Sequence, residues 1–255
     1  MNRTTQYIFD LILVLTQKEM KVRYKNNVLG YLWSIINPLA FALVFFIAFK
    51  VVMRVRMENY TLFLITGLFP WQWLSNSINS SPKCFISNAP IIKKVNFPRS
   101  AVILASVLQD TIHFLLAIPV IILFMFIYHK VPSLKWLYGI PILLVVQFLF
   151  AYGISLVLAS ANLFFRDLER LTGILVFFVF YLTPIIYPAK MVPDDYKFLL
   201  NLNPVAPLIM SWRDLFIRGV VNPESIMISF LYGAALFMFG HLVYSRLSWK
   251  FAEVL

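Results

Sequence analysis

This sequence of 255 residues is poor in charge and nearly devoid of cysteine. Charged residues make up 13% of the chain, whereas hydrophobic residues make up 61%. An average soluble domain is about half apolar and about one-quarter charged, so this composition excludes an ordinary soluble fold. Cys84 is the only cysteine, which excludes an intrachain disulfide.

Acidic residues are scarce too, because 11 Asp and Glu face 22 Lys and Arg, for a net charge of +11. In a soluble protein such an excess of positive charge would indicate binding to nucleic acid. Here the cations lie mostly at the ends of apolar segments, where anionic lipid headgroups favour them. Membrane lipids, and no nucleic acid, are therefore the predicted contacts.

Motifs of the common catalytic and nucleotide sites are missing. None of the eight glycines is followed by Lys, so the phosphate-binding loop Gly-x-x-x-x-Gly-Lys-Ser/Thr is absent. Neither His-Glu-x-x-His nor Cys-x-x-Cys occurs, so no metal site is predicted. Asp167 and Glu169 lie between Arg166 and Arg170, which favours a charge-paired helix start over acid–base catalysis. An enzyme that acts alone is not predicted.

Long stretches without Asp, Glu, Lys or Arg dominate the sequence. Six of them are residues 28–49, 59–82, 111–129, 136–165, 171–189 and 225–245. A helix needs about 20 mostly apolar residues to cross a bilayer, and surface helices of soluble proteins need a polar face. The predicted fold is therefore an all-α polytopic membrane protein with six transmembrane helices in a single domain, residues 1–255.

An amphipathic interface helix is predicted over residues 1–27, ahead of the membrane region 28–250. Its apolar face has the spacing i, i+3, i+4 and i+7, in Ile8, Leu11, Ile12 and Leu15. A basic cluster follows at residues 18–25, and this combination suits a helix that lies on lipid headgroups. A solvated helix against a partner protein is an equal alternative. More loop cations fall inside if both termini are cytoplasmic, which is the predicted orientation in a bacterial inner membrane.

Two connections between the apolar stretches stand out. The cytoplasmic one, residues 82–99, has three prolines that limit helix length, so one or two short helices are expected. Its four cations surround apolar residues that are expected to be exposed for docking, namely Phe85, Ile86, Ile91 and Ile92. The external one contains residues 198–212, uncharged and interrupted by Pro204 and Pro207. It predicts a re-entrant helix pair between spans 5 and 6, with a soluble apolar loop as the alternative.

Asp110 and His113 lie about one turn apart in the third predicted span. An intramembrane carboxylate is a functional-site hypothesis, but Asp110 also suits a polar cavity or a pair with a cation on another helix. Ala151, Ser155 and Ala159 have the spacing of a closely packed helix face. Tyr and Trp near span ends are expected as interfacial anchors, namely Trp71, Trp73, Tyr128, Trp136 and Tyr138.

Six strings of residues, in this order, resemble those of the ABC-2 type exporter permeases. They are Lys21-Val22-Arg23-Tyr24-Lys25 with Leu29-Gly30-Tyr31-Leu32-Trp33 and Pro38-Leu39; Gly67-Leu68-Phe69-Pro70-Trp71; Lys93-Lys94-Val95-Asn96-Phe97-Pro98-Arg99; Asn162-Leu163-Phe164-Phe165-Arg166-Asp167-Leu168; Pro184-Ile185-Ile186-Tyr187; and Asn203-Pro204. The resemblance runs over residues 18–250. It is to the polysaccharide exporters, which include O-antigen permeases of the Wzm type and teichoic acid permeases.

The resemblance implies a homodimer around a channel, with two copies of a cytoplasmic ABC ATPase that bind ATP and Mg. It implies no cofactor in this chain and an undecaprenyl-linked glycan as the exported substrate. O-antigen is the expected cargo, with teichoic acid or another ABC-2 cargo as alternatives. An ion-coupled secondary transporter would need charges near the midplane, for which only Asp110 and His113 are candidates, so this alternative is less favoured. A membrane-embedded glycosyl- or acyltransferase would need a carboxylate or His cluster at an interface, and the sequence has no such cluster.

Three sets of candidate site residues follow from the resemblance and from side-chain chemistry. The ATPase-coupling set is Phe85, Ser87, Asn88, Ile91, Lys93, Lys94, Arg166 and Asp167. The set for substrate or the lipid pyrophosphate is Lys21, Arg23, Tyr24, Lys25, Tyr31 and Trp33, for which topology and lipid contact are an alternative role. The channel-lining candidates are Phe41, Phe45, Tyr181 and Tyr187, because aromatic faces suit sugar rings.

Overall fold

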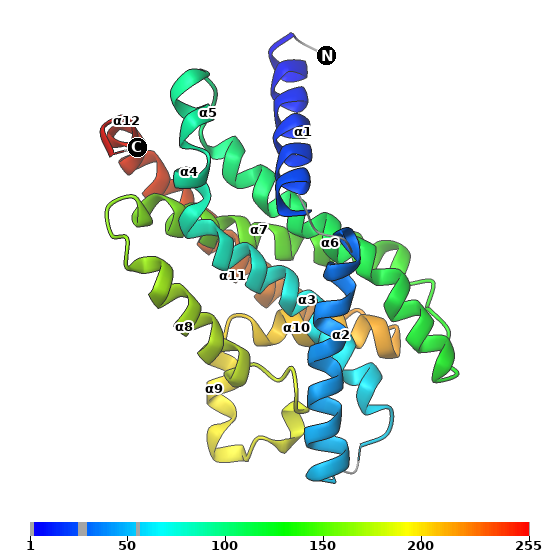
Figure 1. The fold of residues 1–255 in the computed structure, drawn as a ribbon. Coiled ribbons are helices and arrows are strands. Elements are labelled where there is room, and N and C mark those ends of the chain that lie inside the picture. The colour runs from blue at the N-terminus through cyan, green and yellow to red at the C-terminus, as the bar shows by residue number, and fades with distance from the viewer. Residues whose placement is uncertain (1–2, 25–29, 55–56, 255) are drawn as a thin grey trace.

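The computed structural model describes residues 3–24, 30–54 and 57–254, and all regular structure in these ranges is helical. The all-α prediction is thus confirmed (Figure 1). The longer helices are α1 (Arg3–Tyr24), α2 (Trp33–Phe45), α3 (Tyr60–Ser80), α6 (Ser100–Ile127), α7 (Trp136–Asn162), α8 (Leu168–Leu182) and α11 (Pro223–Leu247). The shorter ones are α4 (Cys84–Ser87), α5 (Ala89–Lys94), α9 (Lys197–Leu202), α10 (Ala206–Arg213) and α12 (Phe251–Val254).

Four helical segments in the described part of the chain are long and apolar enough to cross a membrane. They are Ile35–Val52, Ser100–Ile127, Trp136–Asn162 and Pro223–Lys250. The first consists of most of α2 and the π-helical segment that continues it, Phe46–Val52. The other two predicted spans correspond to α3, which is rich in polar residues, and α8, which has 15 residues. The count of six spans therefore stays a prediction.

Helix α3 is the central element, and most of its residues are buried. It contacts α2, α6, α7, α8 and α10. Gln147 of α7 donates from Nε2 to the carbonyl oxygen of Pro70 at 2.8 Å, and its Oε1 accepts from Trp212 Nε1 at 2.6 Å. Because buried polar groups need partners, one glutamine fixes the positions of three helices.

Helix α7 packs closely on two sides. Toward α11, a Cβ on Gly240 would lie 2.2 Å from the carbonyl oxygen of Gly153, so only glycine allows this approach. Toward α3, Ser155 Oγ donates to Ser77 O at 3.4 Å. The close-packing prediction for Ala151, Ser155 and Ala159 is confirmed, since all three are fully buried.

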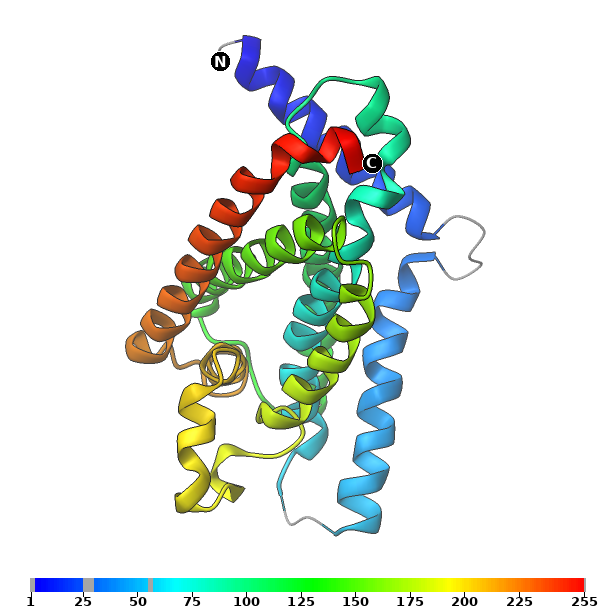
Figure 2. The ribbon, with the colours of Figure 1, turned by 90° about the vertical axis from the view of Figure 1, so that its left-hand side faces the viewer.

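The two ends of the molecule differ. Helices α1, α4, α5 and α12 lie together at one end, and α9 lies at the other (Figures 1 and 2). Both terminal helices thus share an end, as the predicted topology requires. The segment expected to be a broken apolar pair forms α9 and α10, with Pro204 between them, and α10 is buried through Leu208, Ile209 and Trp212.

Candidate functional site

An aromatic wall lies between α2, α3 and α8. A pocket of about 260 Å³ is lined there by three of the four channel candidates, Phe41, Phe45 and Tyr181. The fourth, Tyr187, is adjacent, since its hydroxyl donates to the carbonyl oxygen of Tyr181 at 3.0 Å. The structure therefore brings the candidates together from segments far apart in the sequence.

Further aromatic rings complete this wall. Phe180 lies 5.6 Å from both Phe45 and Trp71, and Phe177 lies 4.9 Å from Tyr181, all between ring centroids. Trp71, Trp73 and Trp136 are buried in the protein, so their prediction as interfacial anchors is wrong; each packs in the core against other helices. Phe41, Phe177 and Tyr181 are exposed, so the wall is open on one side.

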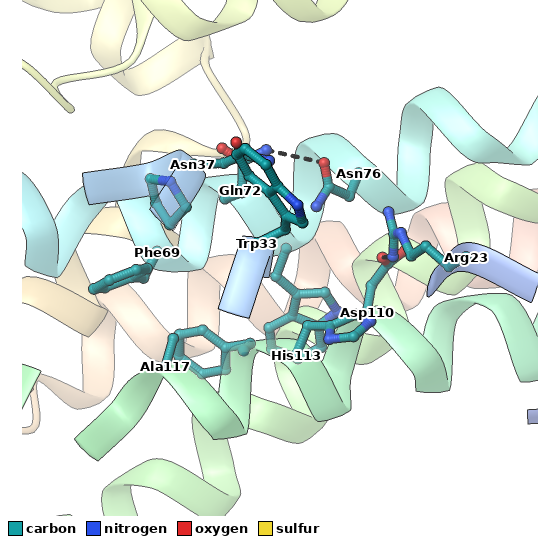
Figure 3. Close-up of a pocket in the computed structure, with 12 residues that line it drawn as sticks. Arg23, Trp33, Asn37, Phe69, Gln72, Asn76, Asp110, His113 and Ala117 are labelled. Atoms are coloured by element: carbon teal, nitrogen blue, oxygen red, sulfur yellow. Dashed lines mark hydrogen bonds and ion pairs between the residues drawn. The ribbon is translucent and has the colours of Figure 1, made fainter. Parts of the chain in front are cut away.

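The last turn of α1 is tied to α6 by an ion pair. Arg23 Nη1 lies 2.5 Å from Asp110 Oδ1 (Figure 3). Ser77 Oγ donates to the other carboxylate oxygen at 3.0 Å. Of the roles open to Asp110, the structure confirms the pair with a cation on another helix. His113 lies on the same face of α6 and lines the same cavity as Asp110.

The remaining candidates for the lipid pyrophosphate are placed unevenly. Lys21 is exposed near the end of α1, and Trp33 is the exposed first residue of α2. Tyr24 and Tyr31 lie on helical turns, but their side chains are outside the described part of the structure. Lys25 lies outside the described residues altogether.

The coupling region 82–99 folds into the short helices that its prolines predict, α4 and α5. Ser87, Lys93 and Lys94 are exposed, and Ile91 is half-buried. Phe85, expected to be exposed, is fully buried, with its ring centroid 5.0 Å from that of Phe251. It anchors α4 to the C-terminal helix and is not available to a partner.

Asn88 connects the coupling region to α1. Its side chain is buried, its Oδ1 accepts from Lys18 Nζ, and its Nδ2 donates to Cys84 O at 2.9 Å. Cys84 beside it is buried as well, and burial raises the pKa of its thiol to about 12. This part of the region is packed between α1 and α4.

Two contacts join the coupling region to the helix ends on either side of the turn before α8. Lys83 Nζ lies 2.6 Å from Oε1 of Glu169 in α8, and Asn162 Nδ2 at the end of α7 donates to Pro82 O at 2.8 Å. Arg166 and Asp167 in the turn itself are both exposed. The two segments of the coupling set are therefore neighbours in the structure.

Sequence reasoning missed Arg213, which it treated as one of the cations of an external loop. Its side chain is 8% exposed and donates to the carbonyl oxygens of Pro184 and Ile185 at 2.7 and 2.9 Å. Its guanidinium carbon lies 3.6 Å from the centroid of the Phe63 ring, a cation–π contact. The signal available was a cation directly after Trp212, at the end of the uncharged stretch 198–212. Arg213 fastens α10 to the turn after α8.

Comparison with known proteins agrees with these features. The family of ABC-2 type transporters matches residues 10–217. The O-antigen export system permease protein RfbA of Klebsiella pneumoniae is 51% identical over 98% of this chain and 96% of its own length. RfbA of Myxococcus xanthus is 31% identical over 81% of this chain and 80% of its own length. The polysialic acid transport protein KpsM of Escherichia coli is 24% identical over 84% of this chain and 83% of its own length.

Proposed function

Because this chain belongs to the ABC-2 type transporter family, we propose that it is the membrane subunit of an exporter that moves a lipid-linked polysaccharide of the O-antigen type. One observation carries the proposal: a protein named as an O-antigen export permease is 51% identical over 98% of the chain.

ATP hydrolysis is assigned to a separate cytoplasmic chain, present in two copies, that binds ATP and Mg. Supporting this, the sequence has no phosphate-binding loop, and residues 82–99 present exposed side chains such as Lys93 and Lys94 beside the turn before α8. The ion pair of Asp110 with Arg23 argues against an ion-coupled transporter, because a proton- or cation-coupling carboxylate would have to exchange its partner.

Two copies of the chain are proposed to enclose the channel. The aromatic wall on α2 and α8 is open on one side, and a second wall related by a two-fold axis would close it. In this arrangement α3 and α8 cross the membrane with the four apolar helices, although α8 is short. Helices α9 and α10 then form a re-entrant pair on the external side, and both termini are cytoplasmic.

The proposed coupling route begins when ATP binding draws the two ATPases together. Their motion reaches residues 82–99 and passes along two contacts. Lys83 and Glu169 transmit it to α8, which carries half of the aromatic wall. Lys18 and Asn88 transmit it to α1 at the membrane surface. Movement of α8 against α2 would then open or close the channel.

The carrier pyrophosphate is proposed to meet Lys21, Tyr24, Lys25 and Tyr31 near the start of the membrane region. Arg23 is reassigned, because its charge is balanced by Asp110. It holds α1 against α6, so that the other cations stay at the level of the headgroups. An undecaprenyl-linked glycan is the expected substrate. Polysialic acid and teichoic acid are the alternative cargoes.

Reconstitution tests the proposal. The chain and its ATPase are placed in sealed vesicles with lipid-linked O-antigen, and transfer is measured as protection from an added glycosidase. Transfer is expected only with hydrolysable ATP, and faster for O-antigen than for lipid-linked polysialic acid or teichoic acid. Transfer driven by an ion gradient without ATP would overturn the assignment as an ATP-driven exporter. Faster transfer of another glycan would overturn the assignment of O-antigen as the cargo.

A further inference from the structure

A second cavity, behind α2 and away from the exposed face of the aromatic wall, has the chemistry of a sugar site. It lies between the end of α1 and helices α2, α3 and α6 and has a volume of about 400 Å³. Sites for small molecules span about 300–1,000 Å³. In Figure 3, Asn37, Gln72 and Asn76 lie along one side of it, while His113 of α6 lies on the other.

The charges that line this cavity are balanced. Arg23 and Asp110 line it as an ion pair, so their formal charges cancel. A pyrophosphate or another anion would have to compete with Asp110 for Arg23, at the cost of leaving a buried carboxylate unpaired. A neutral polar ligand meets no such conflict.

One buried donor beside this cavity has no partner. Trp73 lines the cavity and is 2% exposed, and its covered Nε1–H has no hydrogen-bond acceptor among the described residues. Buried indole N–H groups usually find an acceptor, and an unmade hydrogen bond of this kind is costly. We therefore expect the indole to turn toward a ligand oxygen when the cavity is occupied.

Amide groups supply both donors and acceptors. Gln72 Nε2 donates to Asn76 Oδ1 at 2.9 Å, and within the described ranges Gln72 Oε1 and Asn76 Nδ2 make no other hydrogen bond. Hydroxyl groups both donate and accept, so they match this mixed set. The rings of Trp33 and Phe69 also line the cavity and offer apolar faces. An apolar face beside donors and acceptors suits a pyranose ring.

We infer that this cavity binds one neutral pyranose unit of the exported glycan. The inference rests on the proposed export function for the identity of the glycan, and on the cavity for the chemical class. Gln72 lines both this cavity and the aromatic wall, so the two sites are adjacent. A sugar unit held beside the wall would be positioned at the cytoplasmic half of the channel, since Asp110 lies about 15 Å along α6 from Ser100.

Direct binding tests this inference. The complex with its ATPase, in lipid nanodiscs free of glycoside detergent, is titrated with methyl β-D-glucopyranoside and methyl N-acetyl-β-D-glucosaminide. Tryptophan fluorescence reports binding, and inorganic pyrophosphate and phosphocholine are the contrasting probes. Saturable binding of a pyranoside is expected, with a dissociation constant of about 1 mM for a ligand of this size. Binding of only pyrophosphate or phosphocholine, or of no probe, would overturn the inference.

Trp73→Phe keeps an aromatic side chain and removes the indole N–H. It should weaken pyranoside binding about three- to tenfold, as expected for one hydrogen bond. Asn37→Ala, at a more exposed position, should also weaken it and guards against misfolding of the first variant. Trp249→Phe is the matched control, because Trp249 is exposed and far from the cavity in sequence and fold. Equal affinity in all three variants would overturn the inference.

Vesicle transfer separates this inference from the export function. Trp73→Phe should raise the apparent KM for lipid-linked glycan by the same factor. Glycan transfer with a normal KM in this variant, together with absent pyranoside binding, would overturn the sugar site alone. Pyranoside binding without any ATP-driven glycan transfer would support the cavity and overturn the export function.

Discussion

Arg23 and Asp110, 87 residues apart in the sequence, form an ion pair with 2.5 Å between Nη1 and Oδ1. The side chain of Asp110 is 2% exposed, and that of Arg23 is 34% exposed. The pair therefore joins a surface helix to the buried face of α6. Ser77 from the central helix completes the group, so three helices meet at one carboxylate.

Replacement of Arg23 by Gln should destabilise the protein. Breaking a buried pair from one side costs about 3–5 kcal/mol, and the partial exposure of Arg23 reduces this to about 2 kcal/mol. The loss arises because Asp110 stays buried without a countercharge. Thermal unfolding of the purified chain in detergent, followed by tryptophan fluorescence, measures it.

The double variant Arg23→Gln with Asp110→Asn is the control for this prediction. It removes both charges and keeps hydrogen-bonding groups, so it should recover at least half of the loss. If the losses of the two single variants simply add in the double variant, the two side chains do not interact and the tether between α1 and α6 is wrong.

Arg213→Met should cost about 3 kcal/mol, because the carbonyls of Pro184 and Ile185 lose their donors and lie buried. Arg213→Lys should retain only part of this stability, since a lysine ammonium cannot donate to both carbonyls with the planar geometry of the guanidinium. Arg218→Met is the matched control, as its exposed ion pair with Asp214 contributes less than about 1 kcal/mol. Equal unfolding temperatures for the variants at 213 and 218 would contradict the fastening role of Arg213.

Local signals predicted the local structure well. The N-terminal helix, the two short helices of the coupling region and the break at Pro204 all follow from residues close together in sequence. Four of the six uncharged runs contain helices apolar enough to span. Charge, proline and apolar spacing act within a few residues, so one sequence suffices to read them.

The same local signals do not predict contacts between segments that are distant in the sequence. Phe85 and Trp71 are buried because α12 and α8 pack against them, and neither neighbour is visible from the residues around them. Arg213 has the charge of a loop residue and the environment of a core residue. The amides Asn37, Gln72 and Asn76 are uncharged and lie in two different helices, so nothing in the local sequence marks them as a site. The fold decides these roles, because it determines which faces meet.

Asn88→Ala should weaken coupling between ATP hydrolysis and transport. The variant loses the hydrogen bonds to Lys18 and to Cys84 O, at a cost of about 1–2 kcal/mol in local stability. ATP consumed per glycan transferred in vesicles is expected to rise severalfold. Asn96→Ala, at an exposed asparagine of the same region, should behave as the wild type, and an unchanged ratio for Asn88→Ala would remove Asn88 from the coupling route.

Cys84 should react with N-ethylmaleimide very slowly in the folded protein. Only the thiolate reacts, and burial raises the pKa of this thiol to about 12. The labelling rate should therefore rise about tenfold per pH unit from pH 7 to 10, with no plateau. The urea-unfolded chain is the control and should reach a plateau near pH 9. A plateau at that pH in the folded protein, measured by mass spectrometry, would mean that Cys84 is not buried.

Gly173→Trp should block export without unfolding the chain. Gly173 lines the aromatic wall, and a Cβ built there meets nothing within 4 Å, so a large side chain fits and projects into the open space. Replacing glycine within a helix also removes a backbone entropy cost of about 0.5–1 kcal/mol, so stability should hold. Gly173→Ala makes the same backbone change without the obstruction and should transport normally. Glycan transfer in vesicles is expected to fall at least tenfold for Gly173→Trp alone, since the indole would project from the aromatic wall into the proposed channel between the two copies. Wild-type transfer by this variant, with a normal unfolding temperature, would show that the glycan passes elsewhere.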